Sequence, residues 1–498
     1  MLENLQDELQ IRLDEQTEWL LIRSSGKSFA LQNSEIELEL TNSKLLFSFL
    51  DDEGFQTWRV TGCQFDGGEI ALNLTRNFGK ENEQMRLVSR VSAKELSENI
   101  ELARLEKANK IAQIIKEDDP KIKLVRVELN KENGRFAQII FESPNGRQTA
   151  VLTDVSDALT PEILLSSAIL WLSRLENRRK NPIEIIWILG EKKRSKNLQK
   201  LHALLREGWK RKIYIKEISR QSAKTQREKL QKKNAINDLA SLEVADLWRE
   251  KPKEIQTIEN RQISRAAQEI IELAPDKIDA IFSRHGETLR FLGLPFARVR
   301  KISDKEKIWF GIEKNRTVLA GHNLKDLLEL VENLRIYRRF DSPNKQHAFY
   351  AQAPEAWLEA ILRRNIKLLD ANLVLSPLYH QFRAEKDKID LLALRRDGRL
   401  VIIEIKIAPD REMIFQAADY WRKIELLKRK GNMQKARIFG DMEISDKPTL
   451  VYLVAPTLSF HKDFKFLADT ISPEIEIHRF NLAENWRENL KVLERKRI

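Results

Sequence analysis

Residues 388–406, KIDLLALRRDGRLVIIEIK, constrain the fold of this 498-residue chain more than any other stretch. Two apolar runs, each long enough for a strand, flank a polar turn that ends in Asp397-Gly398. A two-residue turn would make Asp390 face away from Glu404, whereas a three-residue loop sets the two carboxylates directly across from each other. Such loops favour glycine in the left-handed position at their end, where Gly398 stands. We therefore expect a hairpin with these carboxylates about 5 Å apart at Cβ.

Glu404 and Lys406 lie two residues apart, so they share one face of their strand, roughly 6.5 Å apart along it. Their neighbours Ile403 and Ile405 point into an apolar layer, where a charged pair is costly unless it has a use. Two close carboxylates repel each other unless a cation or a proton lies between them. Hard oxygen ligands suit Mg²⁺ or Mn²⁺, and a lysine beside them can orient or help deprotonate water and offset phosphate charge. These residue types together predict hydrolysis of a phosphodiester bond.

The pattern Asp390…Glu404-Ile405-Lys406 resembles the PD-(D/E)XK nuclease superfamily, whose members include restriction, repair and recombination nucleases. The resemblance covers about residues 355–455, a fifth of the chain. The proline that often precedes the first aspartate is replaced by Ile389, as in RecB-like members. The resemblance implies a restriction-endonuclease-like αβββαβ domain. The residue pattern itself predicts a helix at 354–369 and strands near 378–383, 389–395 and 400–406.

Two flanking helices extend the resemblance to RecB-type and NucS-type endonucleases. In the helix that contains WLEAILRRNIKLLDANL, Glu359 matches a glutamate of the metal site, and Glu355, one turn earlier, competes for that role. Gln416 and Tyr420 match the Q-x-x-x-Y motif and share a helix face. The resemblance implies that Asp390, Glu404 and Glu359 bind Mg²⁺ or Mn²⁺ and that Lys406 positions the water. It also implies that Gln416 and Tyr420 orient the active site and touch DNA.

The same residues have a purely structural interpretation. Asp390 and Lys406 would then form a cross-strand ion pair, and Glu359 would face solvent. Gln416 and Tyr420 would be surface and packing residues of their helix. The alternative function is therefore a catalytically inactive, nuclease-like DNA-binding or scaffold protein.

We expect a multidomain α/β chain. Residues 1–90 predict a small β module that binds nucleic acid, binds protein or simply packs, because a short charged helix at 1–16 is followed by alternating strand-like runs at 17–76. Residues 91–220 predict a basic αβ domain, and residues 221–350 a helical linker with a small α+β region. Residues 351–498 form the nuclease domain, closed by a basic amphipathic tail at 481–498.

An α-β-β-β-α-β order occurs in both the second and the fourth of these parts, which indicates an ancestral duplication. In the earlier copy neither of the corresponding strands, RFAQIIFE and RQTAVLTD, contains an E-x-K triplet. The acids near the expected place are Glu142 and Asp154, and no lysine follows Asp154 by two residues. The earlier copy is therefore predicted to be catalytically inactive.

Positive charge is concentrated in one stretch. Residues 178–233 contain 19 Lys and Arg against five Asp and Glu, a surplus of 14 in a chain whose net charge is +12. A field this local attracts polyanions and would hold a nucleic-acid backbone without reading its sequence. Trp209 and Tyr214 lie among these charges and either stack on bases or belong to the core. The expected backbone-binding residues are Lys192, Lys193, Arg194, Lys196, Lys200, Lys210, Arg211 and Lys212.

Composition narrows the remaining possibilities. The lone Cys63 excludes an internal disulfide and a zinc site built from several thiolates. Without an apolar run of about 18 residues or a signal-peptide pattern, we expect a cytoplasmic protein with no membrane partner. Gly26-Lys27-Ser28 lacks the first glycine of a Walker A loop, so no nucleotide cofactor is expected. The prediction is an Mg²⁺-dependent deoxyribonuclease, an endonuclease in repair, recombination or defence, alone or as a homodimer or part of a larger complex. DNA against RNA stays open.

Overall fold

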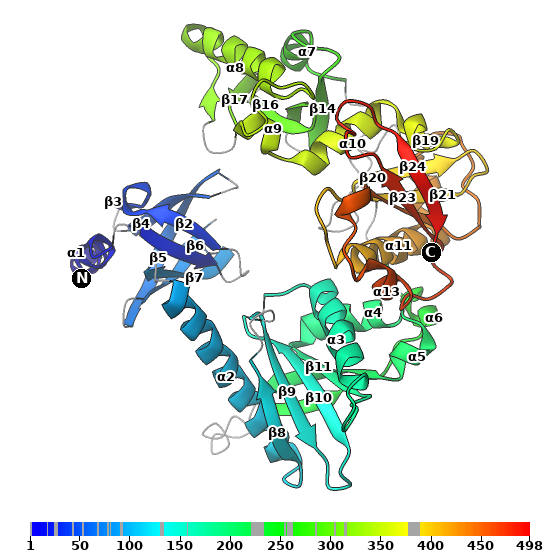
Figure 1. Ribbon diagram of the computed structural model, residues 1–498. Coiled ribbons are helices and arrows are strands. Elements are labelled where there is room, and N and C mark those ends of the chain that lie inside the picture. The colour runs from blue at the N-terminus through cyan, green and yellow to red at the C-terminus, as the bar shows by residue number, and fades with distance from the viewer. Residues whose placement is uncertain are drawn as a thin grey trace.

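In the computed structural model, the described part of the chain contains four separate β-sheets joined by helices (Figure 1). The residues outside the described part of the chain are 1, 17, 24–27, 42–43, 52–53, 67–68, 77–78, 80, 90–92, 130–133, 157, 221–233, 253–254, 256–261, 284–285, 303–304, 313–315 and 377–388. The chain is thus a multidomain mixed α/β protein.

The first sheet has seven antiparallel strands in the order β2-β1-β7-β6-β5-β4-β3. Alternating apolar side chains bury one face around Trp19 and Phe47, and helix α1 (Leu2–Asp14) covers it with Leu9 and Leu13. We did not anticipate β7, because Met85 and Leu87 are its only fully buried residues among many polar ones. The strands are β1 (Glu18–Arg23), β2 (Ser28–Gln32), β3 (Glu37–Thr41), β4 (Lys44–Asp51), β5 (Gly54–Asp66), β6 (Glu69–Arg76) and β7 (Glu81–Ser89).

The second sheet belongs to residues 93–238, which we call lobe 1. Its strand order is β13-β12-β11-β10-β9-β8, with β10, β11 and β12 parallel and the other pairs antiparallel. Helix α3 begins at Pro161, directly after Thr160, because proline is favoured at the first helical position. The elements are α2 (Ala93–Asp118), β8 (Lys123–Glu128), β9 (Phe136–Glu142), β10 (Gln148–Asp154), α3 (Pro161–Glu176), β11 (Ile186–Gly190), α4 (Lys192–His202), α5 (Glu207–Lys210), β12 (Ile213–Arg220) and β13 (Asn234–Asp238).

The third sheet lies within residues 221–350, expected to be a helical linker with a small α+β region, and strands occupy more of this part than we expected. Five antiparallel strands follow one another in sequence order, and helices α7 and α8 supply part of their core. Charged side chains pair within this sheet, as Asp279 and Arg290 do at 2.7 Å. The elements are α6 (Val244–Leu247), α7 (Arg265–Ile271), β14 (Ile278–Ser283), β15 (Gly286–Phe291), β16 (Leu294–Ile302), β17 (Lys305–Phe310), β18 (Thr317–Val318), α8 (Leu324–Tyr337) and α9 (Ala348–Ala351). We call residues 262–340 the middle domain.

The fourth sheet belongs to residues 354–497, which we call lobe 2. Its order is β19-β20-β21-β22-β23-β24, with β21, β22 and β23 parallel. The elements are α10 (Pro354–Arg364), β19 (Leu373–Leu375), β20 (Leu391–Arg395), β21 (Leu400–Ile405), α11 (Met413–Arg429), α12 (Asn432–Lys435), β22 (Leu450–Pro456), α13 (Phe464–Ala468), β23 (Ile477–Leu482) and β24 (Val492–Arg497).

Two expectations for lobe 2 need comment. The strand expected near 378–383 lies outside the described residues, and β19, at Leu373–Leu375, is the first described strand of the sheet. The tail expected to be a basic amphipathic segment instead ends in β24, which pairs antiparallel with β23. Most residues of β24 are exposed, as is common in an edge strand, so its sequence is highly charged and lacks the apolar alternation that would predict a strand.

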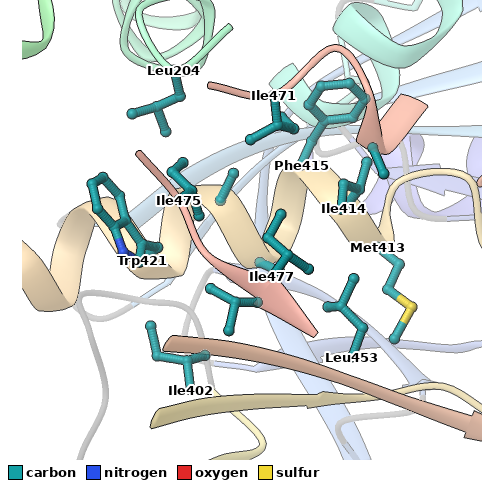
Figure 2. Packing of buried hydrophobic residues seen from close by; sticks show 14 of the residues in the cluster. Leu204, Ile402, Met413, Ile414, Phe415, Trp421, Leu453, Ile471, Ile475 and Ile477 are labelled. Atoms are coloured by element: carbon teal, nitrogen blue, oxygen red, sulfur yellow. The ribbon is translucent and has the colours of Figure 1, made fainter. Parts of the chain in front are cut away.

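The helical layers of the two lobes meet in one continuous hydrophobic core. Helices α11 and α13 of lobe 2 lie against α3 and α4 of lobe 1 (Figure 1). Figure 2 shows Leu204, from the segment after α4, beside Ile471 and Ile475 of lobe 2. Buried side chains of both lobes therefore belong to one hydrophobic core, which we call the shared core.

Candidate active site

The β20–β21 hairpin has the expected register. Leu391 pairs with Ile403 and Leu394 with Leu400, which places Asp390 across from Glu404. The loop has three residues, because Arg395 N donates to the carbonyl of Arg399 at 2.8 Å. Gly398 has φ +78°, a conformation that favours glycine, and a Cβ there would lie 3.1 Å from the Glu443 carbonyl oxygen, which is a tight contact.

Glu404 is the buried acid at the end of β21, with 2% of its surface exposed. Its Oε1 accepts a hydrogen bond from Lys406 Nζ at 2.9 Å. Its Oε2 is buried without a hydrogen-bond partner among the described residues. Burial, and then the charge of Asp390, raises the pKa of Glu404 to about 8. A carboxylate oxygen in this state is costly in the free protein and is available to a cation.

Asp390 lies immediately before β20. Its Oδ2 accepts a hydrogen bond from the backbone N–H of Ile405 at 2.9 Å, which ties it to the strand that contains Glu404. Its charge is also one of the causes of the raised pKa of Glu404. The structure thus brings Asp390 and Glu404 together, as the hairpin register predicted.

Lys406 completes the group at this strand end. Besides Glu404 it pairs with Asp410, 3.6 Å from Nζ. Burial alone would lower the pKa of Lys406, but Glu404, and then Glu355 and Asp410, reverse that effect and raise it. Lys406 is therefore an ammonium ion at neutral pH.

Helix α10 brings Glu355 to this group. Glu355 Oε1 accepts from the backbone N–H of Ile407 at 3.4 Å, and its charge reaches both Glu404 and Lys406. Glu359 is buried one turn later, where its Oε1 lies 3.4 Å from Arg290 of the middle domain. The metal role expected of Glu359 stays a prediction, and the geometry favours Glu355.

The middle domain fixes the start of α10. The buried Arg338 donates hydrogen bonds to carbonyls of the β15–β16 turn and of the segment that enters α10, including Leu292, Gln352 and Ala353. Gly293 packs so close to that helix that a Cβ would lie 2.0 Å from the Ala356 carbonyl oxygen. The position of Glu355 therefore depends on the middle domain.

Gln416 and Tyr420 lie one turn apart on α11, and both are partly buried. Tyr420 packs against the shared core, and the Lys423 ammonium lies 5.7 Å from its ring centre. Their expected roles toward the active site and DNA stay predictions.

Sequence reasoning missed two acids at the start of α11. Asp410 Oδ1 accepts from the backbone N–H groups of Glu412 at 2.6 Å and Met413 at 3.2 Å. Burial, and then hydrogen bonding to Asp410, raises the pKa of Glu412 to about 7. The available signal was the D-x-E spacing just before an apolar helical run, which is typical of a helix N-terminus.

The fit of a metal ion rests on the orphaned Glu404 oxygen. Within the described part of the chain no group of three or more His, Cys, Asp and Glu is arranged to hold a metal ion. Asp390 and Glu404 nevertheless lie next to each other at the end of β21, and Glu355 is near enough for its charge to act on Glu404. Carboxylates that leave positions open for water or phosphate oxygens suit Mg²⁺, which keeps part of its hydration shell. The donor set therefore fits a weakly held hard cation.

The eight expected backbone-binding residues divide into two groups. Four are exposed, namely Lys192, Lys193, Lys196 and Arg211. The other four are less exposed, and each forms an ion pair with an acidic side chain: Arg194 with Asp154, Lys200 with Glu250, Lys210 with Glu207, and Lys212 with Glu176.

The two aromatic residues among these charges also differ. Trp209 packs edge-on against Phe466 of lobe 2, with ring centres 5.8 Å apart, and so belongs to the lobe interface. Tyr214 is 47% exposed and is open to solvent.

Comparison with known proteins adds little. No family model and no curated protein matches the chain. A solved structure described as the apo form of EndoMS aligns with 40% of this chain and 90% of its own at 11% identity. Its TM-score is 0.14, so the alignment carries no argument. Among the described helices, none is long and apolar enough to cross a membrane.

Proposed function

We propose that this protein is a metal-dependent nuclease whose active site lies at the end of β21 in lobe 2. The observation that carries the proposal is the buried Glu404, which pairs with Lys406 through one oxygen and leaves the other without a partner among the described residues. The protein tolerates this cost beside a second carboxylate, Asp390, in a motif that resembles PD-(D/E)XK nucleases. A buried carboxyl group with an unpaired oxygen lowers the stability of the fold, and groups of this kind are candidates for catalysis.

Asp390 and Glu404, with Glu355 in the place first expected for Glu359, would hold one or two Mg²⁺ or Mn²⁺ ions. The bound cation would polarise a phosphate oxygen and lower the pKa of a water molecule. The hydrogen bond from Ile405 N–H to Asp390 keeps that carboxylate oriented toward the strand end.

Lys406 acts as a fixed positive charge. Because its pKa is raised, it keeps its proton at neutral pH and is a poor base. It therefore holds an attacking water through its N–H groups and offsets the charge that develops on phosphate, while a group other than Lys406 accepts the water proton. Of the two roles that the sequence left open for Lys406, orienting the water and helping to deprotonate it, we therefore propose the first.

The substrate that the charge distribution favours is nucleic acid, and we propose DNA. Lys192, Lys193 and Lys196 are exposed on α4 or at its start and would contact phosphates without reading bases. RNA has the same backbone charge and therefore belongs in the test.

The second candidate is a nuclease relic that binds DNA or serves as a scaffold. It is favoured by the finding that the described residues form no three-ligand metal group. A relic would need no divalent cation and would tolerate loss of Lys406.

A cleavage assay tests the proposal. Supercoiled plasmid, linear duplex, single-stranded circles and RNA are incubated with the full chain plus Mg²⁺ or Mn²⁺, with EDTA as the blank. We expect metal-dependent cutting that Glu404→Ala and Lys406→Ala abolish and that Glu488→Ala, an exposed acid of the same lobe, leaves unchanged. Salt-sensitive binding without cutting in any metal would instead support the relic.

A further inference from the structure

Lobes 1 and 2 have the same topology. Each sheet has six strands whose order and sense agree position by position, from β8 with β19 to β13 with β24. The hairpins before the parallel strands agree as well, because Gly146 (φ +77°) and Gly398 (φ +78°) both end three-residue loops. The two glycines therefore supply a residue-by-residue register between the lobes.

The contacts between the lobes are reciprocal. Helix α3 of lobe 1 corresponds to α11 of lobe 2, and α4 corresponds to α13. Helix α3 packs on α13 and α11 packs on α4, while α3 and α11 also meet each other. Equivalent surfaces exchange in this way across a two-fold axis, as in a symmetric dimer.

The backbone repeats this symmetry. Leu205 follows α4, Ile471 follows α13, and the two form an antiparallel β-bridge. Arg206 N donates to the Thr470 carbonyl and Ser472 N donates to the Leu204 carbonyl, both at 2.8 Å. Equivalent segments thus make equivalent hydrogen bonds in both directions.

The chemistry of the lobes is not symmetric. Counted from the two glycines, Gln138, Leu152 and Asp154 of lobe 1 occupy the places of Asp390, Glu404 and Lys406. Leu152 pairs with Gln138 across the hairpin and is fully buried in the shared core. Asp154 accepts hydrogen bonds from Ser156 and Leu159 and pairs with Arg194. Lobe 1 therefore has neither the pair of carboxylates nor the lysine.

We propose that lobe 1 takes the place of a second subunit, so that one chain is a complete, monomeric pseudo-dimer with a single working site. The inference rests on the proposed function for its enzymatic consequence: one site attacks one strand, and each binding event on duplex DNA produces a nick. Lobe 1 covers the apolar helical face of lobe 2 that a partner chain would otherwise cover, and its exposed lysines add phosphate contacts.

The arrangement of the lobes is tested without activity. In a Cys63→Ser background, Leu205→Cys and Ile471→Cys introduce two thiols at a non-hydrogen-bonded antiparallel pair, whose Cα separation of about 4.5 Å suits a disulfide. We expect an intramolecular disulfide, seen as a gel shift that reductant reverses, in a particle of 58.3 kDa by light scattering. A disulfide-linked dimer, or a wild-type particle of twice that mass, would overturn the inference.

The consequence is tested on supercoiled plasmid at limiting enzyme. We expect open circles to accumulate and linear DNA to appear only after many independent nicks. Linear DNA formed directly, without an open-circle intermediate, would overturn the inference and leave the nuclease proposal standing. If no cation supports cutting, the proposed function fails, and the disulfide and mass measurements still decide the pseudo-dimer.

Discussion

Two carboxylates at the ends of equivalent strands have opposite environments. Asp154, at the end of β10 in lobe 1, has hydrogen-bond donors on both oxygens and a guanidinium 3.1 Å away. Glu404, near the end of β21 in lobe 2, shares one oxygen with Lys406 and has a second oxygen without a donor among the described residues. Both are buried.

The two buried carboxyl groups differ in how completely they are paired, and this difference indicates a structural role for one and a ligand-binding role for the other. A fully paired buried carboxylate holds its surroundings together, whereas an incompletely paired one lowers stability and stays available to a ligand. Lobe 1 has the first kind and lobe 2 the second, on one shared topology. The contrast predicts that a neutral residue at position 404 abolishes activity without lowering stability, and that one at position 154 lowers stability without changing activity.

The largest effect is expected for Glu404→Gln. Cleavage should fall by at least about 100-fold, because a carboxylate that would hold the cation is lost. The unfolding free energy in EDTA near pH 7 should stay level or rise by about 1 kcal/mol, since folding must protonate the buried Glu404 at this pH, whereas an amide is neutral in both states. Initial cleavage rates and urea unfolding check this, with Glu488→Gln as the exposed control. A variant that loses stability as well would break the contrast.

Asp154→Asn is the mirror experiment. The amide cannot match a carboxylate beside Arg194, so we expect a loss of about 2–3 kcal/mol of unfolding free energy. Cleavage per folded molecule should be unchanged, because lobe 1 has no catalytic group. Urea unfolding followed by circular dichroism gives the first quantity and active-site-normalised rates the second. Lost cleavage in a folded Asp154→Asn protein would give lobe 1 a catalytic role.

The pH dependence follows from the raised pKa of Glu404. Folded Glu404 keeps its proton up to about pH 8, while the unfolded group releases it near 4.5. Without metal, its contribution to stability is therefore present below pH 4.5 and declines between pH 4.5 and 8. Cation binding displaces this proton, so Mn²⁺ affinity should rise up to about tenfold per pH unit until about pH 8. Calorimetric titrations at several pH values measure this, and a flat profile would contradict it.

Glu355→Gln and Glu359→Gln sharpen the account of α10. Glu355 acts on Glu404 and Lys406, so its loss should lower cleavage about tenfold with little change in stability. Glu359 is paired with Arg290, so its loss should cost about 1–2 kcal/mol of stability and leave cleavage largely unchanged. The reverse pattern would restore the metal role to Glu359.

The smallest effect is expected from the exposed lysines of lobe 1. Replacing Lys192, Lys193 and Lys196 by alanine should lower DNA affinity severalfold and reduce the salt slope of binding by up to about 3. Stability and metal binding should not change. The control replaces Lys116, Lys121 and Lys123, which are exposed elsewhere on lobe 1. Equal slopes for both triple variants would place the DNA contact away from α4.

Much of lobe 2 could be predicted from sequence because its signals are local. The glycine at 398 fixes the loop, the loop fixes the register, and the register brings Asp390 to Glu404. The duplicated order was also visible, since strands and helices follow distinct periodicities.

The misses come from contacts far apart in sequence. Nothing near Glu359 in the sequence reveals that Arg290 lies 3.4 Å from its carboxylate, so the sequence could not show this buried ion pair. A basic stretch of sequence does not reveal such contacts either: acidic side chains pair with Arg194, Lys200, Lys210 and Lys212, and β24 is a strand despite its charge. The sequence shows how many charged residues a segment has, but only the folded structure shows which of them form ion pairs.

The most direct test of the contrast between the lobes is Mn²⁺ binding, followed by electron paramagnetic resonance in wild type, Glu404→Gln and Asp154→Asn. The account predicts that wild type and Asp154→Asn bind Mn²⁺ alike and that Glu404→Gln loses most of the binding. Equal binding by Glu404→Gln and wild type would show that the Glu404 oxygen is not a metal ligand and would contradict the proposed active site.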